Sequence, residues 1–184
     1  MRTLNLLTAV ALALPLGVSA QTTTPPSGYE LRWSDEFNGT SLNTTLWNIE
    51  ENGNGGGNQE LQYYRKENVA VHDGNLVLTA RRENYNNKQF TSGRVNTRDK
   101  AYFKHGIIQA RIKFPKTANG VWPAYWMMGN DYGKVGWPKC GEIDIVETGN
   151  AEGIKNGTQT RLFGATLHWG TGAGAAHKQY GTNY

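Results

Sequence analysis

Three carboxylates lie within the segment Gly141–Glu147, where they alternate with β-branched residues. Isoleucine and valine favour a pleated strand, and alternation places Ile143 and Ile145 on one face, toward the core. Glu142 and Asp144 then share the opposite face, where their like charges repel each other. Such crowding is typical of sites where one carboxyl stays ionised while another keeps its proton. Glycoside hydrolysis needs that pair, because one carboxylate attacks the anomeric carbon and one carboxylic acid protonates the leaving oxygen.

The third acid, Glu147, is out of phase with the other two in a regular strand and would point into the core. A β-bulge around Ile145-Val146 inserts one residue and returns Glu147 to the polar face. Bulges are common beside active sites, so the spacing favours a catalytic strand. Two other interpretations stay open at this point: a solvated strand with scattered acids, or acids that bind a hard cation such as calcium.

The elements that must position these acids are predicted to be short strands separated by Gly, Asn and Asp turns. No segment has a convincing helical period, and 23 glycines argue against long helices. This pattern predicts an all-β chain, a sandwich or jelly roll in one domain. The glycine-rich run 52–58 lacks the Lys-Ser/Thr ending of a phosphate loop, which excludes nucleotide binding. The predicted strands are 75–80, 106–114, 141–147 and 163–169.

Residues 1–20 have the pattern of a secretory signal peptide, with Arg2 before an apolar run and Val18-Ser19-Ala20 as the cleavage site. Residues 21–28 form a polar, proline-containing lead-in that we expect to be flexible. Removal of the leader lowers the formal charge from +4 to +3. A charge this small and unclustered gives no sign of a nucleic-acid partner. The chain is therefore expected to be secreted, extracellular or periplasmic, and not held in a membrane.

The remaining residues, 29–184, are expected to form the catalytic domain. Its last segment, Gly170–Tyr184, resembles a long loop with no strand to close a sheet, so the domain is expected to be truncated at its C-terminus. Cys140 is the single cysteine and cannot form an intramolecular disulfide. A buried structural thiol is favoured over a nucleophile, because no histidine lies near it in sequence to act as its base.

Aromatic residues cluster near the acidic strand, as a sugar cleft requires, because sugar rings present apolar C–H faces. Trp122 and Trp126 have the same parity, so an extended segment places both on one face, and Trp137 lies in a turn just before Cys140. The alternative is that these tryptophans belong to the core. On the strand 163–169, Thr166 and His168 lie opposite the core residues Phe163, Ala165 and Leu167. His168 is then expected within reach of Asp144 or Glu147, although a surface histidine remains the alternative.

These residues together resemble glycoside hydrolase family 16, and within it the laminarinase-like endo-β-1,3-glucanases. The resemblance runs in family order over the chain after the leader. Its motifs are WSDEFNG at 33–39, NQELQYY at 58–64, TSGRV at 91–95, WPAYW at 122–126, WPKCGEIDIVE at 137–147 and TLHWG at 166–170.

The resemblance implies a β-jelly-roll sandwich of two antiparallel sheets, similar to concanavalin A, and a retaining mechanism. By position, Glu142 matches the nucleophile, Glu147 the general acid/base and Asp144 an assisting acid, while His168 matches a cleft histidine. The two residues between Asp144 and Glu147 are typical of laminarinases, whereas lichenases carry one fewer. The substrate-binding residues implied by the resemblance are Arg94, Trp122, Trp126, Trp137 and Asn58.

The chemistry implied by the resemblance needs no cofactor. Family members often bind a structural calcium, for which Glu36 and the Gly74 carbonyl match two ligand positions. Relatives continue with further strands, so the resemblance implies that the fragment by itself need not be active. The expected protein is a monomeric hydrolase of β-1,3- or mixed β-1,3/1,4-glucan in polysaccharide catabolism. The alternatives are a non-catalytic β-glucan-binding module and a transglycosylase on the same fold.

Overall fold

The computed structural model describes residues 23–118, 120–172 and 176–184. The predicted signal peptide, 1–20, lies outside the described residues. Residues 23–28, the described part of the lead-in, have irregular backbone with a turn at its end. The described residues form short strands with a few short helical turns, which confirms the all-β prediction. None of the helices among these residues combines the length and the apolar character needed to cross a membrane.

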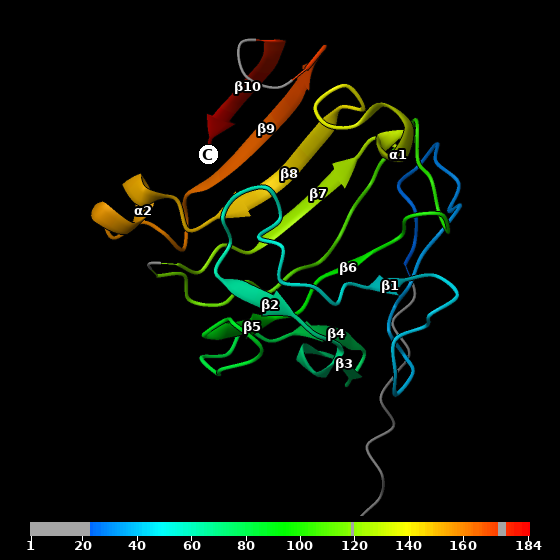
Figure 1. Ribbon diagram of the computed structural model, residues 1–184. Coiled ribbons are helices and arrows are strands. Elements are labelled where there is room, and N and C mark those ends of the chain that lie inside the picture. The colour runs from blue at the N-terminus through cyan, green and yellow to red at the C-terminus, as the bar shows by residue number, and fades with distance from the viewer. Residues whose placement is uncertain (1–22, 119, 173–175) are drawn as a thin grey trace, which may run out of the picture. The chain divides into compact units, whose positions relative to one another are not determined.

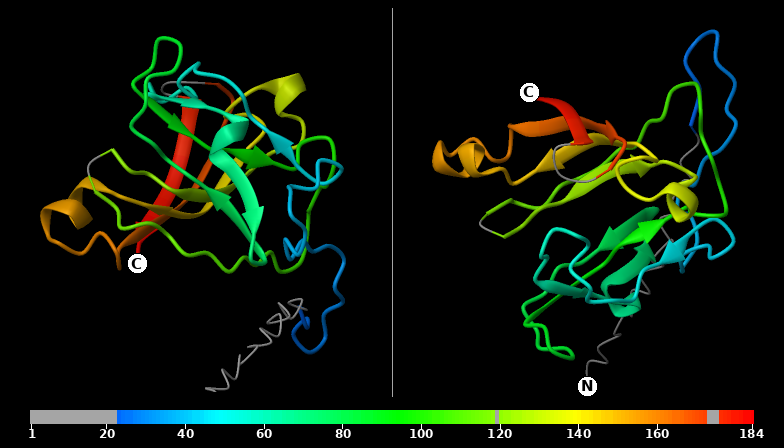
Figure 2. Two further views of the ribbon diagram at one scale, coloured as in Figure 1. Left: turned by 90° about the horizontal axis from the view of Figure 1, so that it is seen from below. Right: turned by 45° about the horizontal axis from the view of Figure 1, so that its top comes forward.

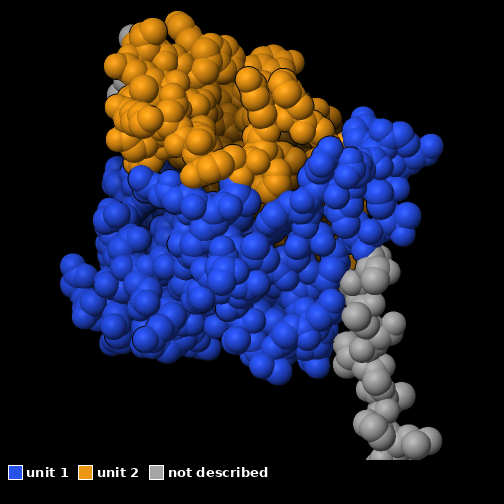
Figure 3. Space-filling model, turned by 90° about the vertical axis from the view of Figure 1, so that its right-hand side faces the viewer, with its two compact units in different colours: residues 1–101 blue, residues 102–184 orange. Residues whose placement is uncertain are grey.

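The chain divides into two compact units, residues 1–101 and 102–184, which are coloured separately in Figure 3. The first unit contains three strand pairs. Strand β1 pairs antiparallel with β6, β2 pairs parallel with β5, and β3 forms a hairpin with β4. The hairpin turns at Asp73-Gly74, both with positive φ, as a tight two-residue hairpin turn of this type requires. The elements are β1 (Asn48–Ile49), β2 (Gln62–Tyr64), the 3-10 turn η1 (Lys66–Asn68), β3 (Val69–His72), β4 (Asn75–Leu78), β5 (Phe90–Ser92) and β6 (Val95–Asn96).

The second unit is built on one antiparallel sheet of four strands in the order β10-β9-β8-β7 (Figures 1 and 2). The carboxylate strand β8 is central, between β7 and β9. The short helix α1 connects β7 to β8, and α2 connects β8 to β9. The elements are β7 (Ala124–Met128), α1 (Tyr132–Val135), β8 (Glu142–Thr148), α2 (Ala151–Lys155), β9 (Phe163–Gly170) and β10 (His177–Asn183).

Strand β8 carries the predicted bulge. On one side, Asp144 pairs with Trp126 and Val146 with Tyr125, so Ile145 is the extra residue. On the other side, the β9 register also shifts between Asp144 and Glu147, where two residues of β8 oppose one of β9. This is the geometry of a β-bulge, and it confirms the prediction from the spacing of the acids.

Two predicted elements differ in the structure. The segment 106–114 was predicted to be a strand, but it forms no ladder and is not a strand. The segment 170–184 was predicted to be a loop, but residues 177–183 form β10, which pairs with β9 over its whole length. Alternation predicts an extended backbone, whereas a strand also requires a neighbour to accept its hydrogen bonds, and that neighbour is not encoded locally.

The sequence predicts that the face of β8 with the isoleucines, and the face of β9 with Leu167, are buried in the core. This prediction is also wrong in part. Ile143 pairs with Leu167 on the face away from the acids, and each is 45% exposed. Asp144, on the acidic face, is only 4% exposed. Alternation fixes which residues share a face, but the cover over each face depends on distant parts of the chain.

Candidate active site

The bulge places all three acids of β8 on one face of the sheet. Each acid pairs with a residue of the antiparallel strand β9, and these three partners are every second residue of β9. Every second residue of a strand points to the same face, so the three acids lie on one face as well. In order, Glu142, Asp144 and Glu147 pair with His168, Thr166 and Gly164. The sequence prediction that Glu147 returns to the acidic face is therefore confirmed.

Glu142 begins the row and contacts Trp137. The indole Nε1 of Trp137 donates a hydrogen bond to Glu142 Oε2 at 2.5 Å. Burial raises the pKa of Glu142, and the neighbouring charge of Asp144 raises it further. The hydrogen bond from Trp137 and the proximity of His168 act in the opposite direction, because both favour the ionised carboxylate. Trp137 therefore holds Glu142 in place and offsets part of the rise in pKa that burial causes.

Glu147 lies at the other end of the row. Burial is the main cause that raises its pKa, followed by the charges of Asp144 and Glu142. A hydrogen bond with the Trp122 side chain lowers it in part. A glutamate whose pKa is raised in this way keeps its proton to higher pH, as a general acid must.

Glu147 also lines a cavity of about 340 Å³. This volume is within the range of small-molecule sites, and its walls combine one large aromatic ring with hydroxyl and amide groups. That combination suits a sugar ring, with its apolar faces and polar rim. The lining residues are Trp122, Glu147, Thr148, Gly149, Asn150, Gly164, Thr166 and Asn183.

Gly149 allows the chain to pass close to this cavity. Its φ is +85°, and a Cβ added there would lie 2.1 Å from the carbonyl oxygen of Val121. Any side chain would push away the segment Val121-Trp122, so glycine at this position holds Trp122 beside Glu147. Trp126 is placed by the sheet itself, because it pairs with Asp144.

Asp144 contacts the predicted histidine. His168 Nε2 lies 3.1 Å from Asp144 Oδ2, and the His168 side chain is only 18% exposed. This confirms the predicted reach of His168 to the acids and excludes the alternative of a surface histidine. The ring of His168 also lies near Trp137, with 6.0 Å between their centroids.

Two predicted substrate-binding residues, Arg94 and Asn58, belong to the first unit. Arg94 Nε lies 3.1 Å from Glu50 Oε1, and its guanidinium carbon is 5.6 Å from the centre of the Tyr64 ring. Asn58 is exposed, and its backbone N–H donates a hydrogen bond to the backbone carbonyl of Gly55 at 2.9 Å. Their roles toward a substrate stay predictions.

The predicted calcium ligands are also in the first unit. Glu36 Oε1 accepts a hydrogen bond from Thr23 at 2.5 Å, and a Cβ on Gly74 would lie 3.9 Å from Asn38 Oδ1. Calcium takes six to eight oxygen ligands, usually with several carboxylates. Among the residues that the structure describes, no group of three or more His, Cys, Asp or Glu side chains is arranged so that it could hold a metal ion. Glu36 and the Gly74 carbonyl would supply only two of these ligands, and the calcium ion stays a prediction.

Cys140 is half-buried, and its thiol lies 3.4 Å from the Met128 sulfur. Burial raises the pKa of the thiol, so it remains protonated at neutral pH. This supports a structural role over a nucleophilic one.

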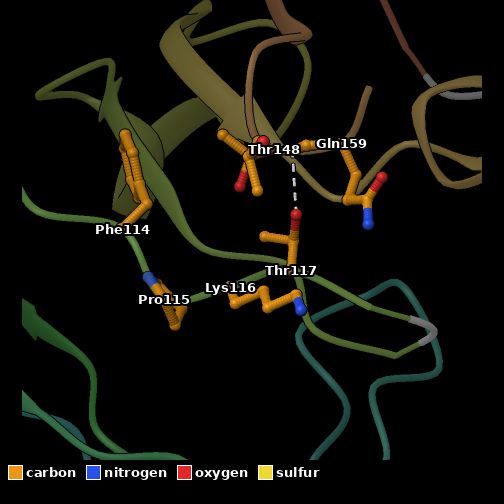
Figure 4. Close-up of a pocket in the computed structure, with 7 residues that line it drawn as sticks. Phe114, Pro115, Lys116, Thr117, Thr148 and Gln159 are labelled. Atoms are coloured by element: carbon orange, nitrogen blue, oxygen red, sulfur yellow. Dashed lines mark hydrogen bonds between the residues drawn. The ribbon is translucent and has the colours of Figure 1, made fainter. Parts of the chain in front are cut away.

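A second cavity, of about 380 Å³, is lined by none of the predicted site residues (Figure 4). Thr148 lines both cavities. It pairs with Phe163, the residue next to the partner of Glu147, so Thr148 and Glu147 point to opposite faces of the sheet. Thr117 donates a hydrogen bond to the carbonyl of Gln159 at 2.9 Å and connects two of its walls. Of the three acids of β8, Glu147 lines the first cavity and none lines the second.

Sequence reasoning missed three residues around the acids. Asn150 and Asn183 line the cavity beside Glu147, and His177 contacts His168. Asn183 and His177 belong to β10, which was predicted to be a loop. The segment 177–183 has no alternation of apolar and polar side chains, so no local signal marked it as a strand.

The raised pKa values of Glu142 and Glu147 predict a pH-dependent stability. A raised pKa in the folded state means that the native protein binds the proton more tightly than the unfolded chain. The resulting stabilisation is complete below the ordinary value of 4.5 and is lost as pH rises through the folded value. We expect Glu147→Gln to raise Tm by roughly 2–4 °C near pH 7 and to change it little near pH 4. Thermal unfolding of the full-length protein at both pH values measures this.

Glu51→Gln is the matched control, because Glu51 is exposed and its substitution should leave Tm unchanged at both pH values. An equal Tm of wild type and Glu147→Gln near pH 7 would contradict a buried acid that is costly to ionise.

Comparison with known proteins gives the family of this chain. Residues 8–142 match the family model "Beta-glucan synthesis-associated protein SKN1/KRE6/Sbg1". The chain is 44% identical over 125 residues to a β-glucanase of Rhodothermus marinus, which covers 65% of this chain and 43% of the relative. A solved family 16 enzyme of Bacteroides ovatus, with a bound mixed-linkage glucan product, superposes with a TM-score of 0.73. It is 39% identical and covers 82% of this chain and 62% of its own.

The chain belongs to glycoside hydrolase family 16. The laminarinase catalytic domain of Thermotoga maritima is similar too, with a TM-score of 0.72, 41% identity, and coverage of 84% of this chain and 62% of that domain. These neighbours confirm the predicted fold class, the β-jelly roll of family 16. The chain spans between 24% and 51% of the lengths of the first curated relatives that it matches.

Proposed function

We propose that this family 16 chain carries the catalytic site of a secreted, retaining endo-β-1,3-glucanase that also accepts mixed β-1,3/1,4-glucan. The single observation that carries the proposal is the row of three acids on β8, with a raised pKa at both of its ends. Similarity to a laminarinase and to a mixed-linkage glucanase supports the substrate class. The predicted leader supports secretion.

In the first step, Glu142 attacks the anomeric carbon and the bond to the leaving sugar breaks. Glu147 donates its proton to the leaving oxygen, which needs a carboxyl that stays protonated near neutral pH. The pKa of Glu147 is raised by burial and by the two neighbouring acids, which suits this role. The products of this step are a glycosyl ester on Glu142 and a shortened glucan.

In the second step, Glu147 is ionised and removes a proton from water. The water oxygen attacks the anomeric carbon, and Glu142 leaves as a carboxylate. The hydrogen bond from Trp137 stabilises the ionised form of Glu142 and therefore favours its departure. Asp144 lies between the two glutamates, and its charge raises the pKa of both. Asp144 therefore helps Glu147 to keep its proton to higher pH.

The cavity beside Glu147 is proposed to bind a sugar unit next to the bond that breaks. Trp122 offers its ring to the apolar face of the sugar, while Asn150, Thr166 and Asn183 offer groups for its hydroxyls. The side chains that would bind further units, Trp126 among them, follow the same face of the sheet.

Product analysis on laminarin, lichenan and xyloglucan tests this proposal with the full-length protein. We expect laminarin and lichenan to be cut into oligosaccharides of intermediate length, with laminarin cut faster. Longer products formed from added acceptor sugars would show a transglycosylase. Binding of laminarin without any new reducing ends would show a non-catalytic module, and would overturn the proposal.

A further inference from the structure

A second histidine lies directly behind His168. His168 Nδ1 is 2.9 Å from His177 Nε2, and the two rings stack with 5.1 Å between centroids and 23° between planes. On its other side, His168 Nε2 is 3.1 Å from Asp144 Oδ2. The three side chains form a continuous line from β8 through β9 to β10.

Strand pairing explains why the line forms. Gly170 pairs with His177 and His168 with Gln179, so both histidines are on the face that carries the acids. Trp137 covers the pair, with its ring centroid 4.6 Å from that of His177. The charged or titratable groups of the sheet on this side are Glu142, Asp144 and Glu147 of β8 and the two histidines. Lys178 follows the opposite parity.

The hydrogen-bond donors and acceptors of Asp144 and His168 give His177 a specific role. An ionised Asp144 can only accept, so His168 must carry its proton on Nε2. The Nδ1 of neutral His168 is then bare and needs a donor, which His177 Nε2 provides. The other neutral tautomer of His168 would place a bare nitrogen against the carboxylate. With its own proton on Nε2, His177 therefore opposes the wrong tautomer of His168 from one side, and Asp144 opposes it from the other.

The hydrogen bond between the two histidines can also form, in the reverse direction, when both nitrogens of His168 carry a proton. Its Nδ1–H then donates to His177 Nε2, which accepts when His177 carries its own proton on Nδ1. Within this geometry the pair holds at most one extra proton, because two charged rings would both present N–H groups to each other. The contact with Asp144 is kept in both states.

We propose that His177 is a positioning residue that holds His168 in the tautomer donating to Asp144, and so fixes the acid between the two glutamates. This rests on the proposed function only for its effect on turnover; the tautomer itself is a property of the fold. His177 touches neither Glu142 nor Glu147 by any hydrogen bond among the described residues.

The test compares His177→Phe with His177→Gln in the full-length protein. Phenylalanine keeps a ring against Trp137 but cannot donate, whereas the glutamine amide can donate to His168. Nitrogen-15 NMR of the imidazoles should show His168 protonated on Nε2 in the wild type and in His177→Gln. In His177→Phe, the Nε2–H form of His168 should lose population to the other tautomer.

The kinetic readout on laminarin should follow the NMR result. We expect His177→Phe to lower kcat about tenfold with little change in KM and to displace the pH profile, while His177→Gln recovers most of the loss. His72→Phe is the control, because His72 is exposed in the β3-β4 hairpin.

The two readouts separate the proposals. An unchanged His168 tautomer in His177→Phe would overturn the role of His177, whatever the activity. An altered tautomer with unchanged kcat and pH profile would overturn its link to catalysis. If the wild type does not hydrolyse any glucan, the proposed function fails, but the tautomer result still decides the positioning role. Should His177→Phe not fold, failure of His177→Gln to keep the Nε2–H tautomer would overturn the proposal.

Discussion

Glu142→Gln is expected to abolish turnover of laminarin while leaving oligosaccharide binding almost intact. An amide cannot form the glycosyl ester, so the covalent step is lost, and we expect kcat to fall by at least about 10³-fold. Binding depends on other groups, such as Trp122 in the cavity beside Glu147. Glutamine has nearly the same shape and keeps an oxygen that can accept the hydrogen bond from Trp137.

Two measurements check this result, initial rates on laminarin and calorimetry with a laminari-oligosaccharide. Glu51→Gln, on an exposed position outside the site, should retain the wild-type rate and Kd. Near-wild-type turnover by Glu142→Gln would show that another residue is the nucleophile. A large loss of binding together with turnover would instead indicate that Glu142 mainly shapes the site.

Glu147→Ala is expected to reduce hydrolysis of laminarin by about 10²–10⁴-fold, the usual contribution of a general acid/base. An aryl β-glucan oligoside with a good leaving group needs little protonation, so its first step should be much less impaired. Added azide needs no general base, and it should restore turnover by attacking the glycosyl ester. The product would then be a β-glycosyl azide.

The pH profile provides a second check on Glu147. Its raised pKa places the alkaline limb of the wild-type profile above the ordinary range of glutamate, and this limb should disappear in Glu147→Ala. Asp144→Asn removes one of the charges that raise this pKa, so its alkaline limb should move to lower pH. Equal losses on laminarin and on the activated substrate, with no effect of azide, would contradict the acid/base role.

Local pattern was sufficient to predict the carboxylate strand. Alternation in β8 and the extra residue before Glu147 are properties of seven consecutive residues, so the bulge and the common face of the acids followed without knowledge of the neighbours. The placement of His168 also followed, because a single parity argument on β9 decides its face.

Pairing between distant segments could not be predicted in the same way. Residues 177–183 are mostly polar, which favours a loop, yet they form β10 because β9 offers an unpaired edge with matching register. Residues 106–114 have a stronger alternating pattern but form no ladder. The histidine pair depends on β10, and therefore His177 could not be recognised as part of the site.

The stereochemistry of the first product tests the central claim most directly. The claim is that Glu142 and Glu147, on one face of a bulged strand, act as nucleophile and acid/base with the separation of a retaining pair, about 5–5.5 Å. Proton NMR of laminarin hydrolysis in the first minutes, before mutarotation, reports the anomer released at the new reducing end. Our account predicts the β-anomer first, with the α-anomer appearing only as mutarotation proceeds. Initial release of the α-anomer would mean that water attacks directly, and it would contradict the assignment of Glu142 as nucleophile.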